Sequence, residues 1–346
     1  MLGISGLAVS AYALGTMTFG SETDEAGAFA QLDRFAEAGG TFVDTADVYT
    51  AGASEEIIGR WLAGRPADVT DQVVLTTKGR FPYASRLGPN NHGLSRRHLA
   101  NALNASLRRL GVERVDLYQV HSHDPVTPLE ETVRFLDDAV RAGKIHYWGL
   151  SNFTGWQTQR AVSTAERLGC VPPVSLQIQY NLLVREVEWE MVPAAQANGL
   201  GIMPWSPLGG GWLTGKYRRD EAPAGATRLG EDPERGVEAY ERRRRQERTW
   251  HVVEEVRAVA DELGRTSAQV ALAWLADRPG VTSVVLGART VAQLDDNLAA
   301  AGLHLSQEHR RRLDDASDPQ AADWPYGPSG DEQRSRPVAA PSARRA

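Results

Sequence analysis

Short apolar runs alternate with longer amphipathic segments along most of the chain. Most of the runs are rich in β-branched residues and are bounded by Gly, Asp or Pro, as expected of strands that are buried on both faces. They lie at residues 13–17, 41–45, 73–78, 115–121, 145–151, 174–179, 201–206 and 281–287. The pattern therefore predicts eight strands.

The segments between these runs carry helix signals. They begin with acidic residues, Ser or Pro and end at Gly, as in residues 24–40, 95–112 and 127–144. Repeated strand–helix alternation favours a (β/α)8 TIM barrel over an open sheet, and right-handed crossovers make its strands parallel. We predict one barrel domain at residues 1–317 and a C-terminal tail at 318–346.

Two segments interrupt the alternation. Residues 207–248 are rich in Gly, Pro and charge, and a loop of that length inside a domain is usually functional or disordered. Its run of arginines, Arg242 to Arg245, is interpreted as a solvated helix face. The tail is rich in Pro, Ala and Arg, and about its last fifteen residues are expected to be disordered.

Composition narrows the classes of partner and compartment. The chain has 346 residues, is 42% hydrophobic and carries a net charge of -6 with acids and bases interspersed, which suggests neither nucleic acid nor an anionic membrane as a partner. Its single cysteine, Cys170, permits no intrachain disulfide and is interpreted as a packing residue in a reducing compartment. No basic signal region or membrane-spanning apolar run is evident. We expect a soluble cytoplasmic protein, predict no metal site and leave its oligomeric state open.

Polar and aromatic side chains end most of the predicted strands or closely follow them. They are Asp44 and Tyr49 (second strand), Lys78 (third), His121 (fourth), Ser151 and Asn152 (fifth), Gln177 (sixth), and Trp205 and Ser206 (seventh). Each residue alone also has a structural interpretation, such as a turn cap, a solvated lysine or a satisfied core histidine. A barrel brings the carboxyl ends of all its strands to one face, so we expect the set to line one mouth.

Four of these residues form a chemically coherent set for carbonyl reduction. Hydride addition to a carbonyl leaves an alkoxide, which a phenol such as Tyr49 can protonate if its pKa of about 10 is lowered. A buried ammonium at Lys78 lowers that pKa, and Asp44 keeps the ammonium charged. The imidazole of His121 can donate a hydrogen bond that orients the carbonyl oxygen.

The motifs that carry these residues resemble those of a known family. "FVDTADVY" contains the Asp and Tyr, "TTK" the Lys, "DLYQVHSHDP" the His and "GLSNF" the Ser and Asn of a nicotinamide-amide motif. With "GLAVSAYALGTMTFG" near the start and "VLGARTVAQLDDNL" near the end, the chain resembles an aldo-keto reductase from about residue 5 to about residue 300. The resemblance implies a barrel that reduces carbonyl groups with a nicotinamide cofactor.

The resemblance also implies cofactor contacts, whereas no GxGxxG follows a strand to support a Rossmann fold. Besides Asp44, the matching positions are Gly15, Thr16 and Met17 after the first strand; Ser151, Asn152 and Gln177 for the carboxamide; Trp205 for ring stacking; Ser206, Pro207, Leu208, Gly210, Lys216 and Arg228 near the pyrophosphate; and Gly287, Arg289, Gln293, Asp296 and Asn297 at the adenosine end.

Two features of this match are specific to the chain. Arg289 in "GAR" favours NADP over NAD because a guanidinium pairs with a 2′-phosphate, although the phosphate-binding Arg of some members is here Gln293. The N-terminus also looks short of the family's usual first hairpin.

Three functions follow from these patterns. The first is an NADP-dependent oxidoreductase that interconverts a carbonyl and an alcohol, including a keto-sugar reductase of a secondary-metabolite pathway. The second is a non-catalytic NADP-binding regulatory subunit resembling the cytoplasmic β-subunits of potassium channels, which carry Asn where this chain has His121. The third is a barrel isomerase or lyase that uses the same four residues.

The expected substrate rim is aromatic and apolar, which suits aromatic, aliphatic or sugar-derived carbonyl compounds equally. Its candidate residues are Met17, Phe19, Phe81, Tyr83, Phe153, Trp212, Trp324 and Tyr326.

Overall fold

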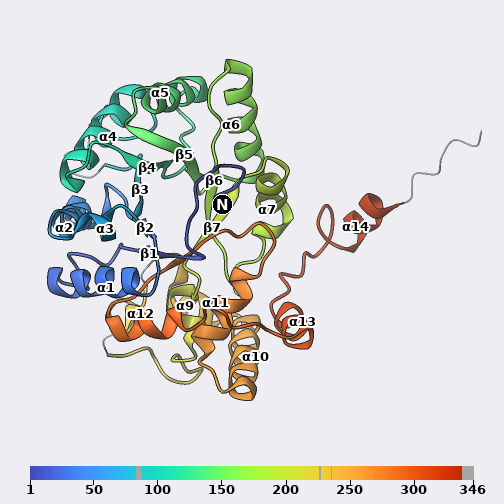
Figure 1. Ribbon diagram of the computed structural model, residues 1–346. Coiled ribbons are helices and arrows are strands. Elements are labelled where there is room, and N and C mark those ends of the chain that lie inside the picture. The colour runs from blue at the N-terminus through green and yellow to red at the C-terminus, as the bar shows by residue number, and fades with distance from the viewer. Residues whose placement is uncertain (83–87, 226, 235, 337–346) are drawn as a thin grey trace, which may run out of the picture.

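Eight parallel strands form a barrel in the computed structural model, which describes residues 1–82, 88–225, 227–234 and 236–336 (Figure 1). The strands are β1 (Tyr12–Gly15), β2 (Phe42–Asp44), β3 (Val74–Gly79), β4 (Val115–Val120), β5 (Ile145–Ser151), β6 (Ser175–Gln179), β7 (Gly201–Trp205) and β8 (Val284–Leu286). Each pairs with its sequence neighbour and β1 also pairs with β8, while an isolated parallel bridge from Ile202 to Val281 links the remaining edges. The predicted (β/α)8 barrel is confirmed.

Helices surround the barrel (Figure 1). They are α1 (Glu25–Glu37), α2 (Ala53–Ala63), α3 (Ala67–Thr70), α4 (Arg96–Leu110), α5 (Leu129–Arg141), α6 (Gly155–Leu168), α7 (Val187–Ala197), α8 (Arg228–Glu231), α9 (Tyr240–Arg244), α10 (Glu247–Leu263), α11 (Ser267–Ala276), α12 (Val291–Leu298), α13 (Gln307–Ala316) and α14 (Pro328–Ser335). The three predicted helices correspond to α1, α4 and α5; Asp24 and Ser95 cap the first two, as side chains with free oxygens do. None of the helices in the described ranges is long and apolar enough to span a membrane.

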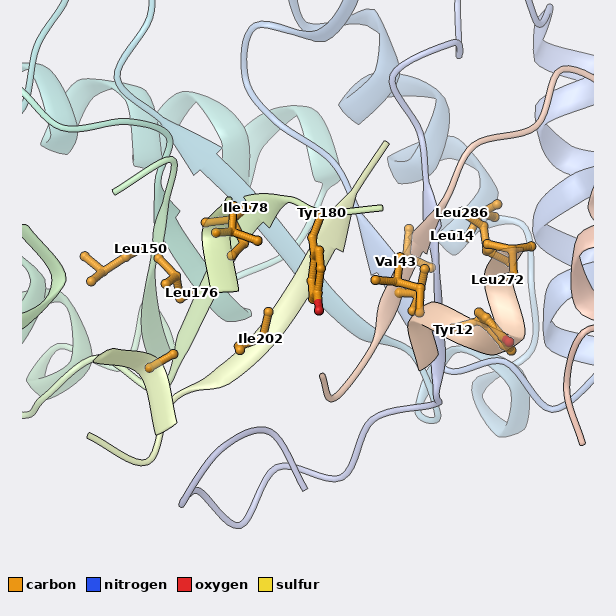
Figure 2. Close-up of a cluster of buried hydrophobic side chains, with 14 of the residues drawn as sticks. Tyr12, Leu14, Val43, Leu150, Leu176, Ile178, Tyr180, Ile202, Leu272 and Leu286 are labelled. Atoms are coloured by element: carbon orange, nitrogen blue, oxygen red, sulfur yellow. The ribbon is translucent and has the colours of Figure 1, made fainter. Parts of the chain in front are cut away.

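The strand side chains alternate between two layers. Outward-facing residues pack against the helices, and Figure 2 shows part of this layer, including Leu14, Val43 and Ile178. A smaller inner cluster is also apolar and contains Leu2, Ala13, Phe42, Leu117, Val174, Met203 and Val285. Burial of these side chains closes the lower barrel, and the charged inward-facing residues Asp44 and Lys78 lie at or near the carboxyl ends of their strands.

The N-terminal segment covers the amino end of the barrel without forming a strand. Leu2 is fully buried in the inner cluster, and the Ile4 amide donates to the carbonyl of Gly199 at 2.8 Å. No strand lies before Tyr12, as the short N-terminus suggested.

The segment after β7 is largely folded. It contains the 3-10 helices η2 (Gly209–Thr214) and η3 (Gly236–Glu238), together with α8 and α9. The prediction that its arginine run is a solvated face is wrong for Arg243, which is 8% exposed and donates to Glu238 at 3.1 Å. The buried ring of Trp212 stacks on Tyr240 at 5.4 Å, so aromatic packing fixes this segment in place.

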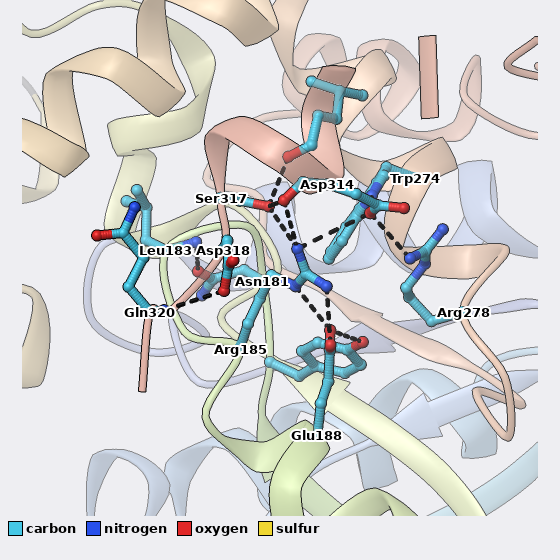
Figure 3. A network of polar contacts seen from close by, with 12 residues as sticks. Asn181, Leu183, Arg185, Glu188, Trp274, Arg278, Asp314, Ser317, Asp318 and Gln320 are labelled. Carbon is cyan, nitrogen blue, oxygen red and sulfur yellow. Dashed lines mark hydrogen bonds and ion pairs between the residues drawn. The ribbon is translucent and has the colours of Figure 1, made fainter. Parts of the chain in front are cut away.

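A polar network fastens α13 to the barrel (Figure 3). Arg185 pairs with Glu188 and also donates to the Asp314 carbonyl at 2.9 Å. The Asp314 carboxylate in turn accepts from Trp274 at 2.8 Å and from Arg278 at 3.0 Å.

Beyond α13 the tail leads to α14, which lies apart from the ring of helices in Figure 1. Tyr326 in this segment stacks on Trp189 with ring centroids 5.2 Å apart. Residues 337–346, for which disorder is predicted, lie outside the described residues.

Candidate active site

Strand register brings the predicted polar residues to one end of the barrel. Asp44 of β2 is paired with Thr76 of β3. Lys78 lies two residues further along β3 and is paired with Gln119 of β4. Ser151 is likewise paired with Gln177. These side chains point into the barrel, as those of the inner apolar cluster do, but they lie nearer the carboxyl ends of the strands. They therefore form a polar layer inside the mouth.

The ammonium of Lys78 is fully buried and has three acceptors. Nζ donates to Asp44 Oδ2 at 2.7 Å, to the carbonyl of Thr45 at 2.9 Å and to the Tyr49 hydroxyl oxygen at 3.4 Å. An ammonium has three protons, so these contacts use all of them. The phenol oxygen therefore accepts from Lys78, and its own proton is available to another acceptor.

Two amide side chains hold the other oxygen of Asp44. Oδ1 accepts from Gln177 Nε2 at 2.9 Å and from Gln119 Nε2 at 3.4 Å. Gln177 is predicted to bind a carboxamide, and in this structure its amide nitrogen orients the carboxylate. Gln119 was missed by sequence reasoning, although it lies two residues before His121 and so shares its inward parity.

The surroundings of these groups set their protonation states. Desolvation raises the pKa of Tyr49, and Lys78 lowers it only in part. The predicted direction of the Lys78 effect is found, but the expected net lowering is not, because removal of water is the larger influence. Desolvation alone would lower the pKa of Lys78, yet Asp44 and Tyr49 together raise it. At neutral pH the site therefore holds a protonated phenol beside a charged ammonium.

His121 faces Tyr49 across the mouth. The two ring centroids are 6.0 Å apart with an edge-to-face geometry, and the ring centroid of Phe81 also lies 5.0 Å from that of the imidazole. Desolvation, followed by the positive charges of Lys78 and Arg80, holds the pKa of His121 well below its ordinary value. The imidazole is therefore neutral, and its Nδ1 has no hydrogen-bond partner within the described part of the chain.

Asn152 links three strand ends at the mouth. Its Nδ2 donates to the His121 carbonyl at 2.9 Å, and its Oδ1 accepts from Trp205 Nε1 at 3.0 Å. Asn152 and Ser206 have φ values of 57° and 54°. Thr50 and Ala51, which directly follow Tyr49, have φ values of 46° and 54°. Left-handed backbone at non-glycine residues is strained and tends to occur at functional sites.

The residues that follow β1 close another side of the mouth. Gly15 pairs with Asp44, and Thr16 Oγ1 donates to the Asp44 carbonyl at 3.1 Å. Met17 is 38% exposed, in contrast to the buried Thr16. These positions suit backbone and side-chain contact with a ligand above the barrel.

The loop after Ser206, Pro207 and Leu208 forms a glycine-lined surface. Gly211 has a φ of 97°, and a Cβ there would lie 2.6 Å from Lys216 Cε. Arg228 begins α8, and its side chain lies near Gly210. Backbone amides, two cations and glycines are a donor set that suits the phosphates of a dinucleotide.

Arg289 lies two residues before α12 and pairs with the end of α8. Its guanidinium donates to both carboxylate oxygens of Glu231 at 3.0 and 2.8 Å and lies 3.5 Å from Glu22. The Arg289 amide donates to Gln293 Oε1 at 2.9 Å. Thus the predicted phosphate ligand forms a bidentate ion pair with Glu231 of α8.

The other adenosine-end candidates are also engaged with the protein. Asp296 accepts from Gln269 at 2.7 Å, and Asn297 donates to the carbonyl of Gly287 at 3.3 Å. Both residues belong to α12, which begins two residues after Arg289. The described residues include no cluster of side chains that could hold a metal ion.

A buried acidic group lies behind the polar layer. Asp47 is fully buried, its two carboxylate oxygens have no partner among the described residues, and its amide donates to the Lys78 carbonyl at 3.1 Å. Desolvation, then repulsion from Glu55, raises the pKa of Asp47 well above its ordinary value. Sequence reasoning gave Asp47 no role, because an Asp after a strand usually caps a turn.

Several predicted rim residues do not reach the mouth. Phe19, Phe153 and Trp212 are fully buried, so they belong to the core and cannot contact a substrate. The ring of Tyr326 stacks on Trp189 of α7 instead of lining the mouth. Tyr83 lies outside the described residues.

Comparison with known proteins gives matches along nearly the whole chain. The profile described as "Aldo/keto reductase family" matches residues 12–318. The chain is 39% identical over 320 residues to an "Uncharacterized oxidoreductase YrpG" of Bacillus subtilis (strain 168), covering 91% of this chain and 94% of that one. It is 39% identical over 307 residues to a "Probable voltage-gated potassium channel subunit beta" of Oryza sativa subsp. japonica, covering 86% and 89%. It is 33% identical over 340 residues to a "Versiconal hemiacetal acetate reductase" of Aspergillus parasiticus, covering 92% and 97%.

Proposed function

The chain belongs to the aldo/keto reductase family, and we propose that it reversibly reduces an aldehyde or ketone to the alcohol with NADPH. Tyr49 donates the proton in this proposal. The observation that carries it is the hydrogen bonding of Lys78, whose three ammonium protons go to Asp44, Thr45 and Tyr49. This arrangement leaves the phenol proton free for a substrate oxygen.

In the proposed reaction, each of the residues at the mouth of the barrel has a separate role. NADPH, when bound, supplies the hydride that reduces the carbonyl carbon. Neutral His121 donates a hydrogen bond to the carbonyl oxygen and orients it toward Tyr49. Tyr49 gives its proton to the oxygen as negative charge develops there, and Lys78 stabilises the resulting phenolate. In alcohol oxidation the same proton returns to Tyr49.

Asp44 has a supporting role in this mechanism. It keeps Lys78 charged inside a dry site, where an unpaired ammonium would be costly. Gln177 and Gln119 fix the carboxylate by hydrogen bonds to its second oxygen. The proton donor is therefore positioned by a chain of contacts that spans four strands.

NADP is proposed over NAD because the segments after β7 and β8 carry cations that could pair with a phosphate. Arg289 can receive a 2′-phosphate once it parts from Glu231. The N-terminus of α12 adds a favourable partial charge. Ser151, Asn152 and Trp205 would hold the nicotinamide end above the Tyr49 hydroxyl.

The direct test is a panel of aldehydes, ketones and keto-sugars assayed with NADPH and separately with NADH. We expect NADPH consumption that depends on the carbonyl substrate, with slower turnover in NADH. Absence of turnover with every carbonyl class and both cofactors would contradict the proposal.

A second candidate is a non-catalytic NADP-binding regulatory subunit, favoured by the 39% identity to the protein named as a potassium channel subunit. Tight NADPH binding without carbonyl-dependent turnover would support this alternative. The relative named as a reductase keeps a keto-sugar or other secondary-metabolite substrate open as a subclass of the first proposal.

The proposed location is the cytoplasm. A single cysteine, Cys170, is consistent with a reducing compartment. Fractionation of cells that express the chain would test this location.

A further inference from the structure

Arg80 is a cation at the barrel mouth to which the proposed mechanism gives no task. It follows β3 and is half-buried, two residues after Lys78. Its guanidinium carbon lies 4.6 Å from the ring centroid of Phe81, and that ring contacts His121 at 5.0 Å. One aromatic ring therefore separates the guanidinium from the imidazole that is proposed to orient the carbonyl.

The hydrogen bonds of Arg80 leave the outer edge of its guanidinium for a ligand. Nε donates to the carbonyl of His123 at 3.2 Å, which fixes the direction of the side chain. Within the described ranges, no carboxylate forms an ion pair with Arg80 and neither terminal nitrogen has a hydrogen-bond partner. The sequence from residue 72 to residue 112 contains no Asp or Glu, so the segment that carries Arg80 supplies no acid of its own.

Asp124 belongs to the same loop as His123, and its carboxylate is engaged within that region. Asp124 accepts from the Leu94 amide at 2.8 Å, from Thr127 Oγ1 at 2.7 Å and from the Val126 amide at 2.9 Å. These contacts stabilise its own turn and leave Arg80 without that carboxylate. A partly desolvated guanidinium without an acid partner binds planar anions well, because two parallel N–H groups match two carboxylate oxygens.

We propose that Arg80 binds an anionic group of the substrate, so that the preferred substrates are carbonyl compounds that carry a carboxylate remote from the reacting carbon. The inference rests on the proposed function and adds the substrate class. The carbonyl group lies against Tyr49 and His121, the body of the substrate passes Phe81, and its carboxylate meets the guanidinium. Trp156, which is 57% exposed and contacts His123, offers a further apolar surface beside this path.

The test compares para-formylbenzoate with its methyl ester, which have the same reacting aldehyde and differ in charge. The wild-type protein is assayed with NADPH alongside two variants. Arg80→Met removes the positive charge, and Arg80→Lys keeps the charge but lacks the two parallel N–H groups. Arg108→Met is the matched control, because Arg108 is an exposed arginine on the last turn of α4.

We expect the wild type to prefer the carboxylate by about tenfold or more in kcat/KM, as a charge-assisted pair allows. Arg80→Met should lower kcat/KM for the carboxylate, mainly through KM, by at least about fivefold more than it lowers kcat/KM for the ester, because remote binding is equal in ground and transition states. Arg80→Lys should keep part of the preference, and Arg108→Met all of it.

Other outcomes would overturn the inference. If the wild type reduces both compounds equally well, or if Arg80→Met loses both activities in the same proportion, Arg80 serves only to hold Phe81 and the His123 loop. If the wild type reduces neither these compounds nor any other carbonyl, the proposed function itself fails. The two failures are therefore distinguishable.

Discussion

Replacing Lys78 with Met should change the pH dependence of the reaction as well as its rate. Lys78 Nζ lies 3.4 Å from the Tyr49 hydroxyl, where a unit charge acting on a phenolate is worth about 5 kcal/mol at an effective dielectric constant of about 20. Asp44 is 2.7 Å from the same ammonium and opposes part of this effect. We therefore expect the pKa of Tyr49 to rise in the variant, because the favourable charge of Lys78 is lost.

The assay measures kcat/KM for alcohol oxidation as a function of pH, because that direction requires the phenolate. The rising limb should move to higher pH in Lys78→Met, and kcat at neutral pH should fall by about 10²–10⁴-fold. Lys144→Met is the control, since Lys144 lies at the opposite end of the barrel and donates to Asn104 at 2.7 Å. Coincident pH profiles for wild type and Lys78→Met would refute the tuning role of Lys78.

The stability of the folded Lys78→Met variant must be measured separately from its activity. Removal of Lys78 leaves Asp44 as a buried charge, and loss of one partner of a buried pair costs about 3–5 kcal/mol. The double variant with Asp44→Asn removes both charges and should recover most of that stability. Thermal unfolding of the single and double variants measures this recovery.

Three further predictions concern the neighbouring groups. His121→Asn should keep NADPH affinity but lower kcat/KM by about 10²-fold or more, because the hydrogen bond to the carbonyl oxygen is lost; unchanged kcat/KM would exclude that role. Arg289→Ala should weaken NADPH binding by about tenfold and leave NADH binding nearly unchanged. Its counterpart Glu231→Gln should strengthen NADPH binding by about 1.4- to fivefold, since the Glu231 side chain is 46% exposed and such a pair is worth about 0.2–1 kcal/mol; equal effects on both cofactors in titrations would contradict the phosphate assignment. Asp47→Asn tests the acid whose pKa is raised in the folded state. The folded wild type holds a proton on Asp47 that the unfolded chain releases above about pH 4, so the wild type loses stability as pH rises from there. The Asn variant should therefore gain relative stability in urea unfolding as pH rises above about 4, and a constant difference across that range would contradict the raised pKa of Asp47.

The strand ends were predictable because they follow from local sequence patterns. An apolar run that ends in a polar residue marks the mouth of a barrel, and Asp44, Lys78 and His121 all have this position. Strand alternation could also have identified Gln119, which is two residues before His121, but an isolated glutamine carries little chemical signal. Its contact with Asp44 depends on the register between separate strands.

Contacts between distant segments were not predictable in the same way. Arg243 belongs to a run that reads as a solvated helix face, and its burial depends on Glu238 and the Leu183 carbonyl. The ion pair of Arg289 with Glu231 joins residues 58 positions apart. Such pairs are determined by how the segment after β7 folds over the barrel, and no period in the sequence encodes that path.

The most direct test of the account replaces Tyr49 with Phe. This change removes the proposed proton donor and leaves the ring that faces His121 in place. Carbonyl reduction by Tyr49→Phe should fall by at least about 10²-fold, while NADPH binding measured by fluorescence titration stays within about twofold of wild type. Carbonyl reduction at close to the wild-type rate in this variant would contradict the central claim that Tyr49 donates the proton.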